Sequence, residues 1–297
     1  MNIGSKVATS EVGGTQAISR AVLLLRHVGV LGEASLSELV TLTALSKPTV
    51  RRMLLALMEA GLIGQDNHSK HYHLGVETYA LGQMSNERWG IHQLSIDSLR
   101  HLAQISHDTT FLNVRQGFAT LCLHREEGGH PIRTHVLKPG DRLPLAAGSA
   151  GLAILSALSD AEIDIALAAN RQTIGQSYAS ADIDGIHERI ARTRRTGWAL
   201  NPGLVFAGSW GIAAAIRNPR GEPVAALTVA TVESRLQPER EAELGPLLLA
   251  EVKLLESALS KREHAGRSQV SASAQTTPAP GSTRKAPAKR KKKNSSL

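Results

Sequence analysis

The sequence predicts an α+β protein with two domains, an N-terminal winged helix-turn-helix joined by a linker helix to a larger α+β domain. The length of 297 residues and the hydrophobic share of 42% suffice for two packed cores. Up to residue 61, apolar residues recur at helical spacing, and two short segments around a polar turn follow. Beyond residue 107, strand and helix patterns occur in mixed order, which is typical of helices packed on an antiparallel sheet.

The first predicted helix follows a small, polar segment, residues 1–14, which we expect to be disordered. From Gln16, apolar residues recur along one helical stripe that ends near Gly29: Ile18, Ala21, Val22, Leu25 and Val28. This stripe predicts the first helix of a cluster of three.

Residues 35–61 predict the second and third helices of this cluster. Ser35 and Glu38 have the spacing of a capping box, in which each side chain satisfies a backbone amide of the first turn. Ser46 can cap the next helix, with Pro48 in its first turn, where a missing N–H costs nothing. Gly61 stands where a helix ends in a left-handed conformation. The pattern is therefore a short helix, a tight turn and a second helix.

The last of these helices has one apolar and one basic face. The apolar positions are contiguous on a helical wheel: Val50, Met53, Leu54, Leu57 and Met58. The opposite face carries Thr49, Arg51, Arg52, Ala56 and Glu59. A buried face backed by arginines and a threonine suits a recognition helix in a DNA groove, although a helical hairpin with a solvated basic face has the same pattern. Leu55, on the polar arc, either contacts a thymine methyl or packs against the wing.

A hairpin after Gly61 completes the winged helix-turn-helix, which we place at residues 15–75. Its inward side chains are expected to be Leu62, Tyr72 and Leu74. Its tip, which would lie against the DNA backbone or minor groove, consists of Asn67, His68, Ser69 and Lys70.

The charge of the chain is concentrated in its C-terminal tail. The formal net charge is +8, but residues 265–297 hold eight basic and no acidic residues, which leaves 26 of each sign in the rest. Any DNA affinity of the folded part must therefore come from a local patch. Residues 263–297 lack apolar periodicity and predict a disordered basic tail.

The composition also bounds the compartment. A single cysteine, Cys122, fits a reducing environment. No apolar run approaches the roughly 20 residues of a membrane span, and the N-terminus lacks the apolar segment of a signal peptide. We expect a cytoplasmic, nucleoid-associated protein without a membrane partner.

The linker helix is expected over residues 76–94, with Trp89 as an anchor, and the second domain over 95–262. The domain opens with an amphipathic helix from Ile96 to His107. Strands are expected over 109–117, 118–126, 131–140 and 198–201, and helices over 147–158, 160–170 and 183–197. A hairpin over 211–231 and a long helix from Pro238 to about Lys261 complete the domain.

The chain resembles the IclR-type bacterial transcription regulators over nearly all of residues 15–262. The stretches that carry the resemblance occur in the family's order: GTQAISRAVLLL, LSELVTLTALSKPTVRRMLLALMEAGLI, YHLGVETYALG, PGDRLPL, AGSAGLAIL, RRTGW, PVAALTV and SRLQPER. The resemblance implies a winged helix-turn-helix, a linker helix and a GAF-like domain that binds a small organic-acid effector. It also implies a homodimer or tetramer on a partly palindromic double-stranded operator, with repression the favoured sign of regulation.

Site residues follow from the resemblance by position. DNA contacts fall on the basic face of the second helix of the pair, and we add one cation from the wing tip: Ser46, Lys47, Thr49, Arg51, Arg52 and Lys70. Among these we expect Arg52 to read a base, because arginine bonds guanine in two places, worth ~1–3 kcal/mol of discrimination. The effector pocket maps onto Leu145, Ser149, Ala150, Asn201, Ser209, Gly211, Thr228 and Ala230.

The expected pocket begins at a helix N-terminus, whose amides suit a carboxylate; a close-packed helix start has the same small residues. The sequence departs from the family at several nearby positions, where Leu152, Asn201, Leu204, Gly211 and Ala230 replace more polar or bulkier residues. With Phe206 and Trp210 also close in sequence, these departures predict a roomier, more apolar pocket. We therefore expect an effector larger than a two- or three-carbon acid, such as an aromatic or other hydrophobic carboxylate.

Three other function classes are disfavoured. The segments AGSAG and AGSWG resemble a nucleophile elbow but have Ala in place of the first Gly, so no hydrolase and no catalytic residue is expected. Neither His68, His71 and His73 nor Cys122, His124, His130 and His135 make a convincing metal site, and no cofactor is expected. The lysine-rich tail would add non-specific DNA affinity as an accessory.

Overall fold

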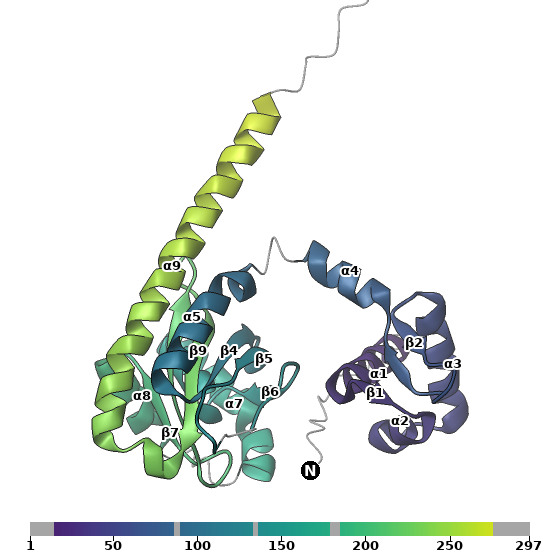
Figure 1. Cartoon of the computed structure of the whole chain (residues 1–297), viewed down its shortest axis with the longest axis horizontal. Coiled ribbons are helices and arrows are strands. Elements are labelled where there is room, and N and C mark those ends of the chain that lie inside the picture. The colour runs from purple at the N-terminus through teal and green to yellow at the C-terminus, as the bar shows by residue number, and fades with distance from the viewer. Residues whose placement is uncertain (1–14, 86–89, 133–135, 179–184, 276–297) are drawn as a thin grey trace, which may run out of the picture.

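The computed structural model describes residues 15–85, 90–132, 136–178 and 185–275, and of residues 265–275 it describes only the helical backbone. Residues 1–14 and 276–297, where disorder was expected, lie outside the described residues, as does Trp89. Figure 1 shows two separate domains joined by a helical segment, with the final helix extending away from the larger domain. The predicted α+β class is confirmed.

Three helices and a small antiparallel sheet form the N-terminal domain. The elements are α1 (Gln16–Leu31), β1 (Glu33–Ala34), α2 (Leu36–Thr43), α3 (Lys47–Glu59), β2 (Ile63–Gln65) and β3 (Tyr72–Leu74). The sheet has the order β1-β3-β2. Its core is apolar throughout and includes Leu24, Val28, Leu39, Val50, Leu54, Leu57 and Ile63. The predicted winged helix-turn-helix is therefore present.

Local signals in the sequence place the helix ends of this domain. The Ser35 hydroxyl accepts from the Glu38 amide at 3.3 Å, and the Glu38 carboxylate accepts from the Ser35 amide at 2.7 Å, so the capping box is confirmed. Gly61 has a φ of 70° and follows the end of α3, as predicted. Ser46 differs, because its hydroxyl bonds the Thr49 hydroxyl at 2.8 Å and caps no amide.

The buried stripe of α1 and the inner face of the wing differ in phase from the prediction. Leu24 is buried with Val28, whereas Ile18 and Val22, predicted to face inward, are exposed. In the wing, Tyr72 is buried as predicted and Ile63 is buried with it, while Leu74 is 43% exposed. In both places, apolar residues occur on neighbouring faces, so the sequence pattern fits more than one choice of buried face.

The linker is shorter than the single helix predicted over residues 76–94. Helix α4 (Val76–Met84) ends early, and α5 (Ile91–Ser106) begins before the predicted Ile96. Ser95 lies inside α5 because its buried hydroxyl donates to the Ile91 carbonyl at 2.7 Å, which removes the cost of burying it.

A six-stranded antiparallel sheet forms the centre of the second domain. Its spatial order is β6 (Arg142–Pro144), β5 (Ala119–Glu126), β4 (Thr109–Gln116), β9 (Pro223–Val232), β8 (Ser209–Arg217) and β7 (Ala199–Pro202). The strand predicted over 131–140 is wrong for its described residues, which form a loop. There the Gly140 amide donates to the Cys122 carbonyl at 2.8 Å, and the Asp141 amide to the Lys138 carbonyl at 3.0 Å.

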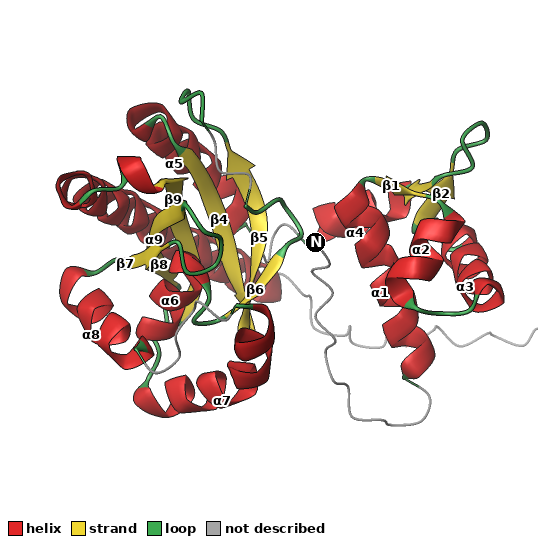
Figure 2. Cartoon of the chain, turned by 90° about the horizontal axis from the view of Figure 1, so that it is seen from below, coloured by secondary structure: helices red, strands yellow, loops and turns green. Residues whose placement is uncertain are grey.

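Helices cover both faces of this sheet (Figure 2). One face packs against α6 (Gly148–Ser156), α7 (Asp160–Ser177) and α8 (Ile186–Thr196). The other packs against α5 and α9 (Pro238–Gln275). Helix α9 continues past the predicted end at Lys261, so the backbone of residues 263–275 is helical where disorder was expected. No helix in the described part of the chain is long and apolar enough to cross a membrane.

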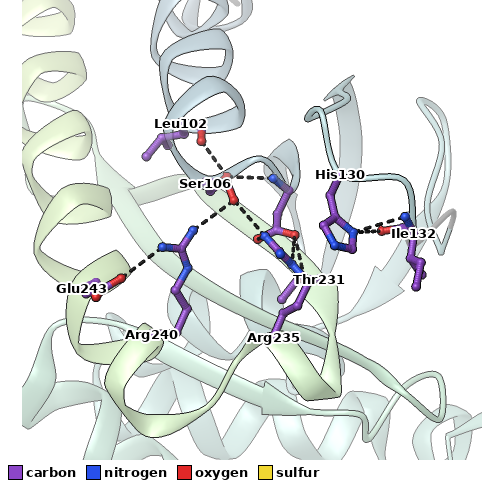
Figure 3. A network of polar contacts seen from close by, with 9 residues as sticks. Leu102, Ser106, His130, Ile132, Thr231, Arg235, Arg240 and Glu243 are labelled. Carbon is purple, nitrogen blue, oxygen red and sulfur yellow. Dashed lines mark hydrogen bonds and ion pairs between the residues drawn. The ribbon is translucent and has the colours of Figure 1, made fainter.

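A buried ion pair ties the end of α5 to the turn before α9 (Figure 3). The Asp108 carboxylate accepts from Arg235 Nε at 3.0 Å and Nη2 at 3.1 Å, and from the Thr231 hydroxyl at 2.7 Å. Arg235 and Arg240 each donate to the Ser106 carbonyl, at 3.1 and 3.0 Å. These contacts satisfy orphan groups at the helix C-terminus.

Candidate functional site

The exposed face of α3 carries the predicted DNA-contacting residues. Ser46, Lys47, Arg51 and Arg52 are exposed, and Thr49 is partly buried. No hydrogen bond or ion pair within the described chain engages the Lys47, Arg51 or Arg52 side chains. Because these cations have no partner among the described residues, they are available to phosphates and base edges. The Leu55 side chain is 56% exposed.

The wing tip is held by one aspartate. Asp66 Oδ1 accepts from the Ser69 amide at 2.7 Å, the His68 amide at 2.9 Å and the Ser69 hydroxyl at 3.0 Å. The bonds from Ser69 and then His68 lower the pKa of this carboxyl. Lys70 follows in the left-handed region with a φ of 58° and an exposed side chain. The wing therefore presents a cation from a defined turn.

A cavity lies between the α6 side of the sheet and the loop that connects β7 to β8. It encloses about 480 Å³ including its open mouth, and the centre of a water molecule reaches about 50 Å³ of it. The volume open to a water centre exceeds the ~10–15 Å³ that one water molecule needs. None of the described lining residues is charged.

The structure brings most of the predicted effector residues together on this cavity. The predicted residues on its wall are Ser149, Ala150, Asn201, Ser209, Gly211, Thr228 and Ala230. Leu145 is not among the described wall residues: it is fully buried in the core with residues of α6 and α7. Its backbone is fixed there, because its amide donates to the Phe118 carbonyl at 2.8 Å and its carbonyl accepts from Asn170 Nδ2 at 3.3 Å.

Two of the sequence departures also lie away from the cavity. Leu152 is buried in the core, and Leu204 packs against that core. Gly211 and Ala230 do line the wall. A Cβ on Gly211 would stand 3.0 Å from the Ser149 hydroxyl, so the glycine leaves space beside that group. The predicted enlargement of the pocket therefore rests on positions 201, 211 and 230, which line the wall.

Several lining residues were not predicted. They come from β4, β5, β6, the start of α6, β8 and the loops before β6, α6 and β8, and they are Phe111, Asn113, Thr120, Val136, Leu137, Leu143, Ala147, Gly148, Val205, Phe206 and Trp210. Phe111 and Asn113 alternate with Leu112 and Val114, which pack in the opposite core. This alternation in TTFLNVRQ was the available signal, but it does not say which face holds a cavity.

The N-terminus of α6 points free amides at the cavity. Its cap residue is Ala147, which has no side chain to bond the first turn, and Ala146 and Gly148 have φ values of 80° and 72°. The amides of Gly148, Ser149 and Ala150 have no partner among the described residues. Uncapped amides at a helix N-terminus carry partial positive charge and bind anions. An alanine held at positive φ marks local strain, which concentrates at functional sites.

Side-chain donors surround this helix start. The Ser149 hydroxyl is 5% exposed and makes no hydrogen bond within the described structure. Asn201 Oδ1 accepts from the Leu204 amide at 3.2 Å, which leaves its Nδ2 group as the free half of the amide. The Ser209 hydroxyl is likewise buried without a described partner. Together with the α6 amides, this end of the cavity offers hydrogen-bond donors.

The cysteine and the histidines that were considered as a metal site make separate contacts. His124 Nδ1 lies 3.2 Å from His92 Nε2, and His124 Nε2 lies 3.2 Å from the Glu126 carboxylate. Burial, and secondarily Asp141, raise the pKa of the Cys122 thiol to about 12, so it stays protonated at neutral pH. Within the described residues, no group of three or more His, Cys, Asp or Glu side chains could hold a metal ion. His135 lies outside those residues.

A winged helix-turn-helix with a free basic face, attached to a domain with an anion-suited cavity, defines a ligand-responsive transcription regulator. Residues 17–67 match the family described as "IclR helix-turn-helix domain", and residues 84–255 match "Bacterial transcriptional regulator IclR C-terminal". The second match covers more than half of the chain, which therefore belongs to the IclR family of bacterial transcription regulators. Members of this family are DNA-binding regulators with an effector-binding C-terminal domain, and the family is not one of enzymes.

Individual relatives align over most of their length. The chain is 25% identical over 255 residues to the "HTH-type transcriptional repressor AllR" of Klebsiella pneumoniae, covering 85% of this chain and 93% of that one. A putative IclR regulator structure from Silicibacter sp. TM1040 has 27% identity and a TM-score of 0.67, covering 82% and 96%. An IclR homologue from Microbacterium hydrocarbonoxydans, complexed with 4-hydroxybenzoate, has 20% identity and a TM-score of 0.70, covering 83% and 100%. At that identity, the likeness concerns the fold alone.

Proposed function

We propose that this regulator is a cytoplasmic, nucleoid-associated repressor whose homodimer binds a partly palindromic operator and responds to a hydrophobic or aromatic carboxylate. The observation that carries the proposal is the pairing of two sites: unpaired cations on α3, and free amides of α6 at an uncharged cavity. The similarity to a protein named as a repressor supports the sign of regulation.

Operator binding is assigned to Ser46, Lys47, Thr49, Arg51 and Arg52 on α3 and Lys70 on the wing. We expect Arg52→Ala to weaken binding of the cognate operator by about 5- to 150-fold, because a bidentate arginine–guanine contact is worth ~1–3 kcal/mol. Fluorescence anisotropy with an operator identified by footprinting measures this. Arg171→Ala removes an exposed arginine from α7 and serves as the matched control. Equal loss in both variants, or none for Arg52→Ala, would contradict the assignment.

The effector is assigned to the cavity between α6 and the sheet. A carboxylate would accept from the α6 amides, the Ser149 hydroxyl and Asn201 Nδ2, and an apolar body would contact Phe111, Leu137 and Trp210. We expect calorimetry on the full-length protein to detect benzoate and to find glyoxylate and pyruvate much weaker, because small acids leave the apolar wall uncovered. Tight binding of glyoxylate or pyruvate without benzoate would refute this ligand class.

A second copy of the chain is the proposed partner of α1 and α4. No residue of α4 is buried, and its Val76, Tyr79 and Met84 side chains are 80%, 68% and 75% exposed. Ile18 on α1 is 67% exposed. Exposed apolar side chains gathered on two helices favour an interface, and a two-fold axis through this domain would place two α3 helices on the half-sites of a palindrome.

Charges introduced into this surface test the dimer. We expect the double variant Tyr79→Glu, Met84→Glu to sediment as a monomer at concentrations where the wild type is a dimer or tetramer, because burying unpaired carboxylates is costly. Operator affinity should fall with it. Ile165→Glu, on an exposed apolar residue of α7, is the control. A double variant that keeps the wild-type sedimentation coefficient would remove α4 from the interface.

A further inference from the structure

A lysine of the effector-binding domain bonds the winged domain. Lys138 Nζ donates to the Val30 carbonyl at 2.6 Å, although the two residues are 108 positions apart. The backbones also come close, since a Cβ on Gly140 would stand 3.4 Å from Val30 Cγ2. Val30 lies in the last turn of α1, where carbonyls lack a partner within the helix and the helix dipole is negative. That turn has no basic residue of its own. Lys138 therefore supplies, from the other domain, the cation that stabilises a helix C-terminus.

The loop that carries Lys138 also forms part of the cavity wall. We call residues 136–141 the β6 loop, because they lead into β6, which lies on the side of its domain that faces α1 (Figure 1). Val136 and Leu137 line the cavity. Leu137 packs there against three buried residues of the sheet, Phe111, Cys122 and Ala230. Lys138 follows Leu137 directly, so one short loop contacts both the cavity and α1.

Hydrogen bonds make the remainder of the β6 loop a fixed turn. The Lys138 amide donates to Asp141 Oδ2 at 2.8 Å, and the Asp141 amide donates to the Lys138 carbonyl at 3.0 Å. The far end of the turn is attached to β5. There the Cys122 amide donates to the Asp141 carbonyl at 2.9 Å, and the Gly140 amide donates to the Cys122 carbonyl at 2.8 Å. A displacement of Leu137 therefore tilts the end of the turn that carries Lys138, while the other end stays on the sheet.

Like charges oppose the attraction between the two domains. Arg142, the first residue of β6, is held by its bonds to Gln116 Oε1 and the Gly140 carbonyl, both at 3.1 Å. Burial, and secondarily the positive charge of Arg26 on α1, lower the pKa of Arg142. The repulsion between the two arginines acts against the bond from Lys138. Since an exposed cation at a helix C-terminus contributes little by itself, a small change in the cavity wall is enough to separate the domains.

We propose that Lys138 is a positioning residue for operator recognition: it holds α1 against the effector-binding domain, and a ligand that displaces Leu137 releases α1. The proposal rests on the proposed effector site and adds the route from that site to the DNA-binding helix. An apolar ligand at the wall competes with the packing of Leu137 on the sheet. Movement of Leu137 draws Lys138 away from Val30. Helix α1 shares one core with α3, so the winged domain turns as a unit when it is released.

The proposal fixes the signs of two binding effects. The ligand favours the released arrangement, and the operator favours the held one. A variant that is permanently released should therefore bind the ligand more tightly and the operator more weakly than the wild type. Each change should be about 2- to 5-fold, the effect of one exposed cation at a helix C-terminus.

Single-molecule fluorescence measures the arrangement of the domains without a ligand. Dyes are placed on Ser37→Cys in α2 and Gln172→Cys in α7, both exposed, while the native Cys122 is buried. The labelled full-length protein is mixed with an excess of unlabelled protein, so that each assembly carries one labelled chain. We expect Lys138→Met to shift the distances between the dyes to longer values, and Lys138→Arg to keep the wild-type distances. Lys253→Met, on an exposed lysine of α9, is the matched control.

Benzoate and operator affinities complete the test. Calorimetry on the full-length protein should show benzoate binding about 2- to 5-fold tighter in Lys138→Met than in the wild type, and operator binding without benzoate weaker by a similar factor. Arg26→Gln removes the repulsion and should weaken benzoate binding. A merely structural role of Lys138 would not strengthen the binding of a ligand.

The outcomes separate this proposal from the one on which it rests. If the wild type and Lys138→Met have the same distances between the dyes, or if Lys138→Met binds benzoate no more tightly, Lys138 does not position the winged domain, and the effector site stands. If the wild type does not bind benzoate, the proposed acid class is wrong. The dye distances and the operator affinity of Lys138→Met then decide the role of Lys138.

Discussion

Replacing Gly75 with alanine is expected to destabilise the winged domain strongly. Gly75 is the N-cap residue of α4 and has an ordinary negative φ, so its role is steric. An added Cβ would lie 2.8 Å from the Gly61 carbonyl carbon, closer still to its oxygen, and 3.1 Å from the Ile63 amide nitrogen. These are backbone atoms that cannot rotate away. Two hydrogen bonds hold the same two backbone segments together. The Gly75 amide donates to the Leu62 carbonyl at 2.9 Å, and the Glu77 amide donates to the Gly61 carbonyl at 3.2 Å.

The cost of this overpacking should reach the upper end of the usual range, about 3 kcal/mol. Urea unfolding followed by circular dichroism, together with operator binding, measures it. Gly82→Ala is the matched control, because Gly82 lies within α4 and a Cβ there meets nothing within 4 Å. That change should stabilise the helix by about 0.5–1 kcal/mol. If Gly75→Ala unfolds at the same urea concentration as Gly82→Ala, the packing of α4 against the wing is not as tight as the structure indicates.

Signals within a few residues of each other allowed the winged domain to be predicted from sequence. The Ser35–Glu38 box, Pro48 and Gly61 act on the turn in which they stand. The phase of α1 could not be obtained in the same way. Ile18 and Val22 extend the apolar stripe although the monomer exposes them. A pattern of apolar residues does not separate a face that packs in the core from one available to a second copy of the chain.

The effector domain shows a different limit. Its cavity joins Asn113 to Thr228, and hydrogen bonds between residues 115 positions apart depend on strand pairing that one sequence does not specify. The resemblance to a family supplied the positions on α6, β8 and β9 but also Leu145, whose backbone bonds hold it in the core. The segment 131–140 was predicted to be a strand from its apolar alternation. Its described residues instead form a loop, in which the Gly140 amide donates to the Cys122 carbonyl.

Replacing Arg235 with methionine is expected to destabilise the effector domain strongly. Methionine keeps most of the apolar stem, so the change mainly removes the guanidinium that donates twice to Asp108. The Asp108 side chain is 2% exposed, and only the Thr231 hydroxyl would remain as a side-chain donor to it. Removing one partner of a buried ion pair costs ~3–5 kcal/mol, because the other charge is left uncompensated. The Ser106 carbonyl would keep only its bond from Arg240.

A comparison of single and double variants identifies this mechanism. Arg220→Met breaks the exposed pair with Glu222, whose side chains are 73% and 57% exposed, and should cost no more than about 1 kcal/mol. Adding Asp108→Asn to Arg235→Met removes the buried charge and should recover part of the loss, since a neutral amide is cheaper to bury than an unpaired carboxylate. Urea unfolding measures the wild type and four variants: Arg220→Met, Arg235→Met, Asp108→Asn and the double variant. The double variant could instead be less stable than Arg235→Met by the full cost of Asp108→Asn alone. The two side chains would then act independently. Packing of the Arg235 stem, and not its charge, would hold α9 to the end of α5.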